Sequence, residues 1–135
     1  MPGLENGTDT SHTKILLVDD NPGDRRLVIE LLKLLDDRDF TVVEATTLED
    51  ARAMLPDSAA DVVFLDLALP DGTGVYNVET IRAADPDVTI LVLSGSEDER
   101  MTESVLAAGA TAFLSKMDLS DEMLRDALEQ VAAKS

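Results

Sequence analysis

Chemically useful side chains stand where apolar segments of this sequence end. They are carboxylates, a hydroxyl and an amine: Asp19, Asp20, Asp66, Ser94 and Lys116. Asp19 and Asp20 are adjacent, and side-by-side carboxylates repel each other and resist losing their water. Such a pair is tolerable when it is fully solvated, and it is useful when something positive sits between the two groups.

These side chains could carry out one coherent piece of chemistry. Two or three carboxylates at one point hold a hard cation through oxygen, and Mg²⁺ suits a site with few protein ligands and several waters. A third carboxylate, Asp66, can act as the nucleophile toward phosphorus and form an aspartyl phosphate. Lys116 could then pair with a phosphoryl oxygen, and Ser94 could donate a hydrogen bond to another.

The elements that must position these residues follow from the hydrophobic pattern. Short apolar runs predict strands, and longer segments with helical spacing predict helices between them. The predicted strands cover residues 14–18, 40–45, 61–67, 88–94 and 111–115. The predicted helices cover residues 22–35, 48–55, 75–84, 97–109 and 121–133. Five strands alternating with five helices predict an α/β fold with an open, doubly wound parallel sheet.

Local signals support several of these boundaries. Asn21 and Pro22 are suited to the N-cap and first turn of the first helix. Thr47 resembles a weak capping-box residue for the second helix, and Pro56 is expected to stop that helix near residue 55. Gly109 fits the end of the fourth helix.

The parallel sheet brings the chemical residues together. In such sheets ligands bind beyond the carboxyl ends of the strands, at the point where the strand order reverses. The aspartates at the ends of the first and third strands, Ser94 at the end of the fourth and Lys116 after the fifth all lie at this edge. The joint placement carries the prediction, since any one of these residues alone is weak evidence.

Composition restricts the class of protein. The 135 residues suffice for one domain, which we place at residues 14–135 after a disordered N-terminal tail at residues 1–13. Cysteine is absent and His12 is the only histidine, which excludes thiolate and histidine-based sites. No apolar run is long enough to span a membrane and no signal peptide is present, so we expect a cytoplasmic protein.

The net charge of −17 is extreme for this length. It argues against nucleic acid as a partner, because phosphates would be repelled. The acidic excess is spread along the chain, which favours adaptation to a salty cytoplasm over an acidic interaction tail.

Four segments together resemble the receiver domain of two-component response regulators: "LLVDDNPGD", "VVFLDLALPDGTG", "ILVLSGS" and "GATAFLSK". The resemblance extends from Lys14 to Ala133, with the segments in family order and at family spacing. The opening "DDNPGD" also resembles stand-alone receivers related to phytochrome-linked regulators. The resemblance implies a CheY-like fold with flavodoxin-like strand order 2-1-3-4-5.

The resemblance also implies roles for individual residues. Asp66 would accept a phosphoryl group from a sensor histidine kinase or a histidine phosphotransfer protein. Asp20, Asp66 and the backbone carbonyl of Ala68 would bind Mg²⁺ directly, and Asp19 would bind it through water. Ser94 and Lys116 would contact the phosphoryl group. The aromatic switch position of the family falls on Phe113, and an unknown downstream protein would bind the switched surface.

One position departs from the family pattern. The family usually follows its lysine with proline, often through a cis peptide bond, and here the next residue is Met117. A cis bond before a residue other than proline costs about 2.5–4 kcal/mol. We therefore expect a trans peptide bond and a differently shaped loop.

Three alternatives stay open at the level of sequence. An FMN-binding flavodoxin would share the topology, but an acidic "DDNPGD" would repel the flavin phosphate and stacking aromatic residues are scarce. An aspartate-nucleophile phosphatase of the haloacid-dehalogenase type would need a second acid two positions after the nucleophile, where this chain has Ala68. A degenerate receiver could serve only as a scaffold, although the set of site residues is complete.

Overall fold

A computed structural model of the chain describes residues 12–35, 38–95 and 98–134. Within these residues five strands form one sheet in which every neighbouring pair is parallel. Their order across the sheet is β2 (Asp39–Ala45), β1 (His12–Val18), β3 (Val62–Asp66), β6 (Thr89–Ser94) and β7 (Ala112–Ser115). This is the predicted order 2-1-3-4-5, and it reverses between β1 and β3.

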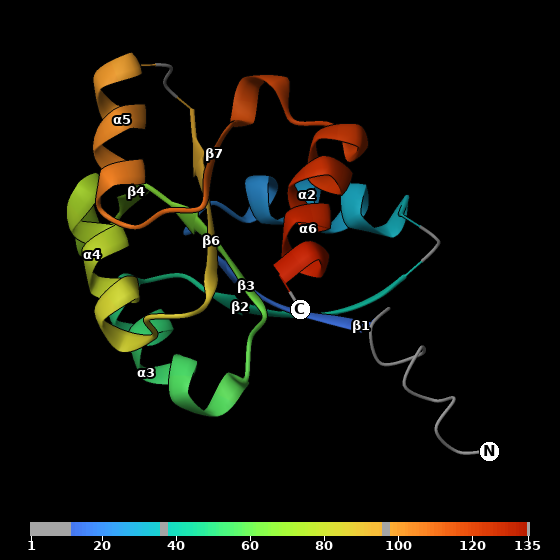
Figure 1. The fold of residues 1–135 in the computed structure, drawn as a ribbon, viewed down its shortest axis with the longest axis horizontal. Coiled ribbons are helices and arrows are strands. Elements are labelled where there is room, and N and C mark those ends of the chain that lie inside the picture. The colour runs from blue at the N-terminus through green and yellow to red at the C-terminus, as the bar shows by residue number, and fades with distance from the viewer. Residues whose placement is uncertain (1–11, 36–37, 96–97, 135) are drawn as a thin grey trace.

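Five helices cover the two faces of the sheet. The face on the left of Figure 1 carries α3 (Leu48–Ser58), α4 (Val75–Ala84) and α5 (Glu99–Ala107). The opposite face carries α2 (Pro22–Lys33) and α6 (Asp121–Lys134). The predicted doubly wound α/β architecture is therefore confirmed.

The core lies on both faces of the sheet, because successive strand residues point to opposite sides. On β1, Leu16 and Val18 belong to the core cluster beneath α3, α4 and α5, and Ile15 and Leu17 belong to the cluster beneath α2 and α6. All four side chains are buried. This burial explains why the central strands appear in the sequence as continuous apolar runs without alternation.

Several boundaries differ from the predicted ones. Helix α3 continues through Pro56 to Ser58, although proline was expected to stop it. The fixed φ of proline is compatible with a helix, and the preceding Leu55 is buried in the core, so the last turn still forms. Strand β1 begins at His12, inside the predicted tail, because it pairs with β2 from Asp39 onward. The remainder of that tail and the predicted start of the fourth helix at residue 97 lie outside the described residues.

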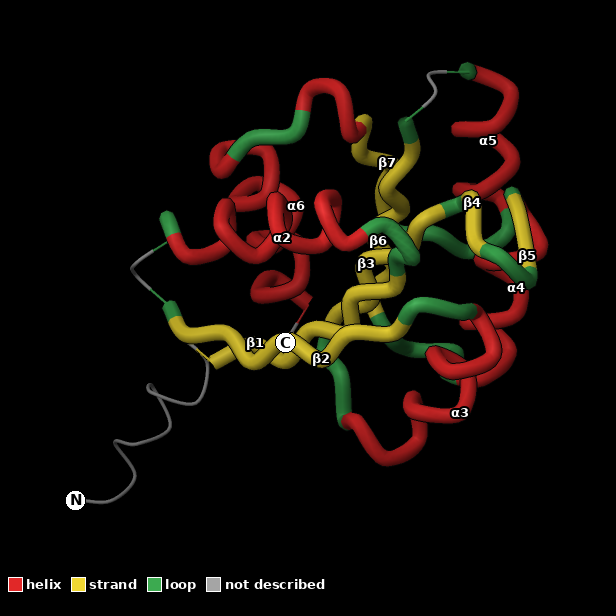
Figure 2. The backbone as a smooth tube through the Cα atoms, turned by 180° about the vertical axis from the view of Figure 1, so that it is seen from behind, coloured by secondary structure: helices red, strands yellow, loops and turns green. Residues whose placement is uncertain are grey.

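Two short elements were absent from the predicted pattern. Strands β4 (Ala68–Leu69) and β5 (Gly72–Thr73) form a small antiparallel hairpin next to α4, separate from the main sheet (Figure 2). A 3₁₀ turn, η2 (Lys116–Asp118), follows β7. The hairpin follows the end of β3, and the 3₁₀ turn follows the end of β7, so both elements shape the predicted site. Among the described residues no helix is long and apolar enough to cross a membrane.

Candidate functional site

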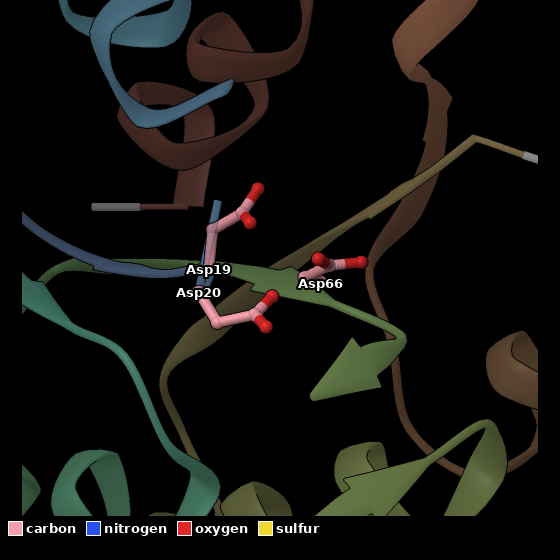
Figure 3. A group of neighbouring side chains, drawn as sticks. All are labelled: Asp19, Asp20 and Asp66. Atoms are coloured by element: carbon pink, nitrogen blue, oxygen red, sulfur yellow. The ribbon is translucent and has the colours of Figure 1, made fainter. Parts of the chain in front are cut away.

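Three carboxylates meet at the carboxyl edge of the sheet, where the strand order reverses. Asp19 and Asp20 follow β1, and Asp66 is the last residue of the neighbouring strand β3 (Figure 3). Each contributes a carboxylate oxygen to a group whose members all lie within 4.8 Å of one another. Asp19 and Asp66 are buried and Asp20 is exposed. The predicted convergence of these three residues is confirmed.

Lys116 is the cation of this site. Its Nζ atom lies 2.8 Å from Asp19 Oδ2 and 3.2 Å from Asp66 Oδ2. It also lies 2.8 Å from Oδ2 of Asp24, a residue in the first turn of α2. The lysine thus connects the end of β7 to the ends of β1 and β3.

Hydrogen bonds to the chain hold Asp66 from two directions. Its Oδ1 atom accepts a hydrogen bond from the backbone N–H of Ala68 at 3.1 Å. Its backbone carbonyl accepts one from the buried side-chain amide of Asn77, also at 3.1 Å, and the same Nδ2 atom donates to the carbonyl of Gly72. The β4–β5 hairpin is therefore tied to the end of β3, which fixes the position of the carboxylate.

The turn after β1 is organised by its own side chains. Asn21 caps α2 as predicted, because its Oδ1 atom accepts hydrogen bonds from the N–H groups of Gly23 and Asp24. Asp19 Oδ1 accepts a hydrogen bond from the N–H of Asn21. Arg25 donates to the carbonyl of Asp19 and forms an ion pair with Glu44 on β2. The acidic pair thus sits on a turn that is fixed on both sides.

Ser94 lies at the end of β6, beside Asp66. The strand register places Leu93 opposite Asp66 and Ser94 opposite Ser115, the residue before Lys116. Ser94 is buried and borders a groove that Asp66 and Ala68 also line. The predicted neighbourhood of the serine, the aspartate and the lysine is therefore observed.

Phe113 lies on β7, opposite Val92 of β6. Its ring packs partly buried against the core cluster beneath α3, α4 and α5. It also lines a groove with residues of α5, β7 and α6, among them Thr102, Ser115 and Met123. A switch function of this ring stays a prediction.

The peptide bond between Lys116 and Met117 is trans, as expected. The chain turns immediately into the 3₁₀ helix η2, which begins at Lys116 and is capped by Ser115, whose hydroxyl accepts a hydrogen bond from the N–H of Met117. Met117 is 77% exposed. The departure from proline thus leaves Lys116 at the site and places a large apolar side chain on the adjacent surface.

Burial and charge shift the acid–base properties of the site. Burial raises the pKa of Asp66 to about 6 in the metal-free protein; the N–H of Ala68 lowers it, Asp19 raises it, and Lys116 lowers it. Burial lowers the pKa of Lys116, but its close contacts with Asp19 and Asp24 and the charge of Asp66 outweigh burial and hold this pKa above its ordinary value. Lys116 is therefore charged at neutral pH.

A stability prediction follows for the metal-free protein. Since the ordinary pKa of this carboxyl is 3.8, the folded state binds the proton of Asp66 more tightly than the unfolded state does, and the associated stability is lost as pH rises through about 6. Keeping Asp66 ionised then costs about 3 kcal/mol at neutral pH. We expect Asp66→Asn to raise the free energy of unfolding by about 1–3 kcal/mol at pH 7 without Mg²⁺.

Urea unfolding in EDTA at several pH values measures this difference. The gap between Asp66→Asn and the wild type should widen from pH 4 to pH 7, because only the wild type carries the buried Asp66 carboxyl, whose pKa is raised to about 6. A variant that is less stable than the wild type at pH 7 would show that Asp66 stabilises the fold.

The donor set fits a hard divalent cation. Three carboxylate oxygens within 4.8 Å are close enough to share one ion, and such oxygens are the ligands that Mg²⁺ prefers. The exposure of Asp20 leaves room for the waters that Mg²⁺ retains. Ala68 borders the groove beside Asp66, and the role of its backbone carbonyl as a ligand stays a prediction.

Two residues of the site were missed at the level of sequence. Asp24 was seen only as part of "DDNPGD", and its contact with Lys116 joins residues 92 positions apart, which no local pattern indicates. Asn77 lies in a helix in which a buried position would be expected to be apolar. A polar residue at such a position is the only sequence signal that could have identified it.

The chain folds as a doubly wound α/β protein. At the carboxyl edge of its sheet it carries a lysine and a group of carboxylates that could bind a cation. The sequence matches the response regulator receiver domain family over residues 15–129. The chain belongs to this family. Membership decides against the flavodoxin and phosphatase alternatives and leaves open whether the receiver is active or only a scaffold.

Individual relatives agree with this assignment. The DNA-binding transcriptional activator DevR/DosR of Mycobacterium tuberculosis is 35% identical over 121 residues, which are 89% of this chain and 54% of that protein. A LuxR-family two-component response regulator from Aurantimonas sp. SI85-9A1 has a TM-score of 0.81 at 27% identity, over 92% of this chain and 87% of that chain. A CheY-like receiver from Methanospirillum hungatei JF-1 has a TM-score of 0.79 at 21% identity, over 92% and 96% of the two chains, and shows the shared fold.

The curated relatives are longer than this chain. It spans about half the length of the curated relatives that it matches, such as 54% of DevR/DosR. These relatives are named as regulatory proteins, among them a DNA-binding transcriptional activator and a photosynthetic apparatus regulatory protein from Rhodobacter capsulatus. The shared part is the receiver domain.

Proposed function

We propose that this receiver accepts a phosphoryl group on Asp66 from a phosphohistidine of a sensor histidine kinase or a histidine phosphotransfer protein. One observation carries the proposal: the Asp66 carboxylate is held within a group that contains two further carboxylates and the ammonium of Lys116. This combination of anionic ligands and a lysine ammonium suits phosphoryl transfer, in which the protein mainly positions groups and stabilises charge.

The chemistry would be a single displacement. An oxygen of Asp66 attacks phosphorus, the bond from phosphorus to the imidazole nitrogen breaks, and the histidine leaves. Lys116 pairs with a phosphoryl oxygen, and the hydroxyl of Ser94 donates a hydrogen bond to another. Asp19, Asp20 and Asp66 would hold Mg²⁺, which neutralises negative charge on the transferring group when it is bound. The N–H of Ala68 keeps the nucleophile oriented.

Phosphorylation by a small donor tests this proposal without knowledge of the kinase. Incubation with acetyl phosphate and Mg²⁺ should add one phosphoryl group per chain, measured by intact mass, and hydroxylamine should remove it because it is an acyl phosphate. Omission of Mg²⁺ is the control. A protein that stays unmodified under these conditions would be a degenerate receiver that serves as a scaffold.

The proposed output is a change at the surface around Phe113. The ring lies in a groove between α5 and α6, where an inward turn would alter the surface offered to a downstream protein. The DNA-binding activity in the name of DevR/DosR belongs to that longer protein. We propose that the receiver itself acts on protein partners in the cytoplasm and does not bind nucleic acid, because a net charge of −17 repels phosphates.

The same charge supports a further proposal, that the protein is adapted to a salt-rich cytoplasm. Self-repulsion among dispersed acidic residues weakens the fold in dilute buffer, and salt screens this repulsion. We expect the melting temperature to rise steadily from low to molar KCl. The Asp66→Asn variant, measured in parallel, separates the general effect from screening within the carboxylate cluster. An unchanged melting temperature across this range would remove the proposal.

A further inference from the structure

The ammonium of Lys116 is shared by carboxylates from three separate elements. Asp19 follows β1, Asp66 ends β3 and Asp24 lies in the first turn of α2, with one oxygen of each between 2.8 and 3.2 Å from Nζ. An ammonium group has three N–H donors. Two of them donate to Asp24 and Asp66, and Asp19 Oδ2 lies at ion-pair distance from Nζ without a hydrogen bond.

A phosphoryl group on Asp66 would compete with the carboxylates of Asp19 and Asp24 for this ammonium. These two partners differ in what they lose when the lysine turns away from them. The side chain of Asp19 is fully buried, so an uncompensated charge there is costly, whereas the side chain of Asp24 is 38% exposed and regains water readily. Asp24 is therefore the partner that gives up the lysine at the smallest cost.

The position of Asp24 is fixed independently of the lysine. Its backbone N–H donates to the side chain of Asn21, which caps the helix, so the carboxylate projects from the first helical turn toward the site. Among the described residues it does not belong to the carboxylate group suited to a metal ion, which comprises Asp19, Asp20 and Asp66. Its contact with the site runs through Lys116.

We propose that Asp24 is a positioning residue that holds Lys116 in the unphosphorylated receiver and competes with the phosphoryl group for it. Asp24 would then set how strongly the domain retains a phosphoryl group, without touching that group. This inference rests on the proposed function, because it assumes that Lys116 binds a phosphoryl oxygen.

Binding of beryllofluoride, a phosphoryl analogue, tests the competition at equilibrium. The apparent Kd for beryllofluoride in the presence of saturating Mg²⁺ would be measured by NMR titration for the wild type and for Asp24→Asn. We expect the variant to bind about three- to tenfold more tightly, as for the loss of a partly exposed ion pair. Asp24→Gln, a neutral residue with good helix propensity, should give the same result if the asparagine variant is poorly folded.

A matched variant separates competition for Lys116 from general electrostatics. Glu30→Gln also removes one negative charge from α2, but Glu30 is exposed and pairs with Lys33 and not with Lys116. We expect its beryllofluoride affinity to stay within about twofold of the wild type, and the gain in Asp24→Asn to persist in molar KCl, because screening acts mainly on distant exposed charges.

The outcomes distinguish the two proposals. Equal gains in Asp24→Asn and Glu30→Gln, or an unchanged or weaker affinity in Asp24→Asn, would overturn the role of Asp24 while the receiver still bound the analogue. A wild-type protein that bound no beryllofluoride and took no phosphoryl group from acetyl phosphate would overturn the proposed function, and this inference with it.

Discussion

Asp66→Asn is expected to abolish phosphorylation. Asparagine keeps the shape of the side chain but lacks the carboxylate that must attack phosphorus, so the aspartyl phosphate cannot form. With acetyl phosphate and Mg²⁺ the wild type should gain one phosphoryl group per chain, and the variant should show less than about one hundredth of that labelling rate. Intact mass and peptide mapping after borohydride reduction measure both the extent and the position.

The control for this variant is Asp57→Asn, which makes the same chemical change at an exposed position on α3. It should be labelled at the wild-type rate. Labelling of Asp66→Asn to the wild-type extent would sink the assignment of the phosphoacceptor.

The stability of Asp66→Asn distinguishes loss of the phosphoacceptor from loss of the fold. Burial and the charge of Asp19 raise the pKa of Asp66, so the ionised carboxylate destabilises the metal-free fold and its neutral replacement should stabilise it. A variant that is more stable than the wild type and yet not phosphorylated has lost chemistry and not structure. A residue that costs stability where it sits is typical of a functional site.

Most of the fold could be predicted from the sequence because its strongest signals are local. The buried runs of β1, β3 and β6 are continuous and apolar, and the capping residue Asn21 stands directly before its helix. Two-residue strands such as β4 and β5 have no room for an alternating pattern, so the hairpin could not be predicted. Pro56 misled the prediction because burial of the preceding Leu55 outweighed a local stop signal.

The sequence predicted those residues of the candidate site that stand at the ends of strands. The topology alone brings Asp19, Asp66 and Lys116 to one edge, and their contacts follow from that placement. The contact of Asp24 with Lys116 depends on the angle at which α2 leaves β1, and the hold of Asn77 on Asp66 depends on the path of the hairpin. Such contacts are set by tertiary packing, which no short motif encodes.

Asp20→Asn is expected to weaken Mg²⁺ binding about a hundredfold. Two unit charges about 4 Å apart near a protein surface interact by about 4 kcal/mol, and a divalent ion at its ligand interacts more strongly, although rehydration of the ion returns part of this. A net loss of about 2.8 kcal/mol corresponds to the hundredfold change. Isothermal titration calorimetry with MgCl₂ at fixed ionic strength measures it. Asp20 is exposed, so the metal-free variant should fold at least as stably as the wild type.

Phosphorylation supplies the second readout for Asp20. At low Mg²⁺ the variant should take up phosphoryl groups from acetyl phosphate slowly, and high Mg²⁺ should restore much of the rate, because Asp20 contributes to metal affinity while Asp66 remains the nucleophile. Asp57→Asn, which removes the same charge far from the site, should keep the wild-type Mg²⁺ affinity. If Asp20→Asn binds Mg²⁺ as tightly as that control does, Asp20 is not a metal ligand.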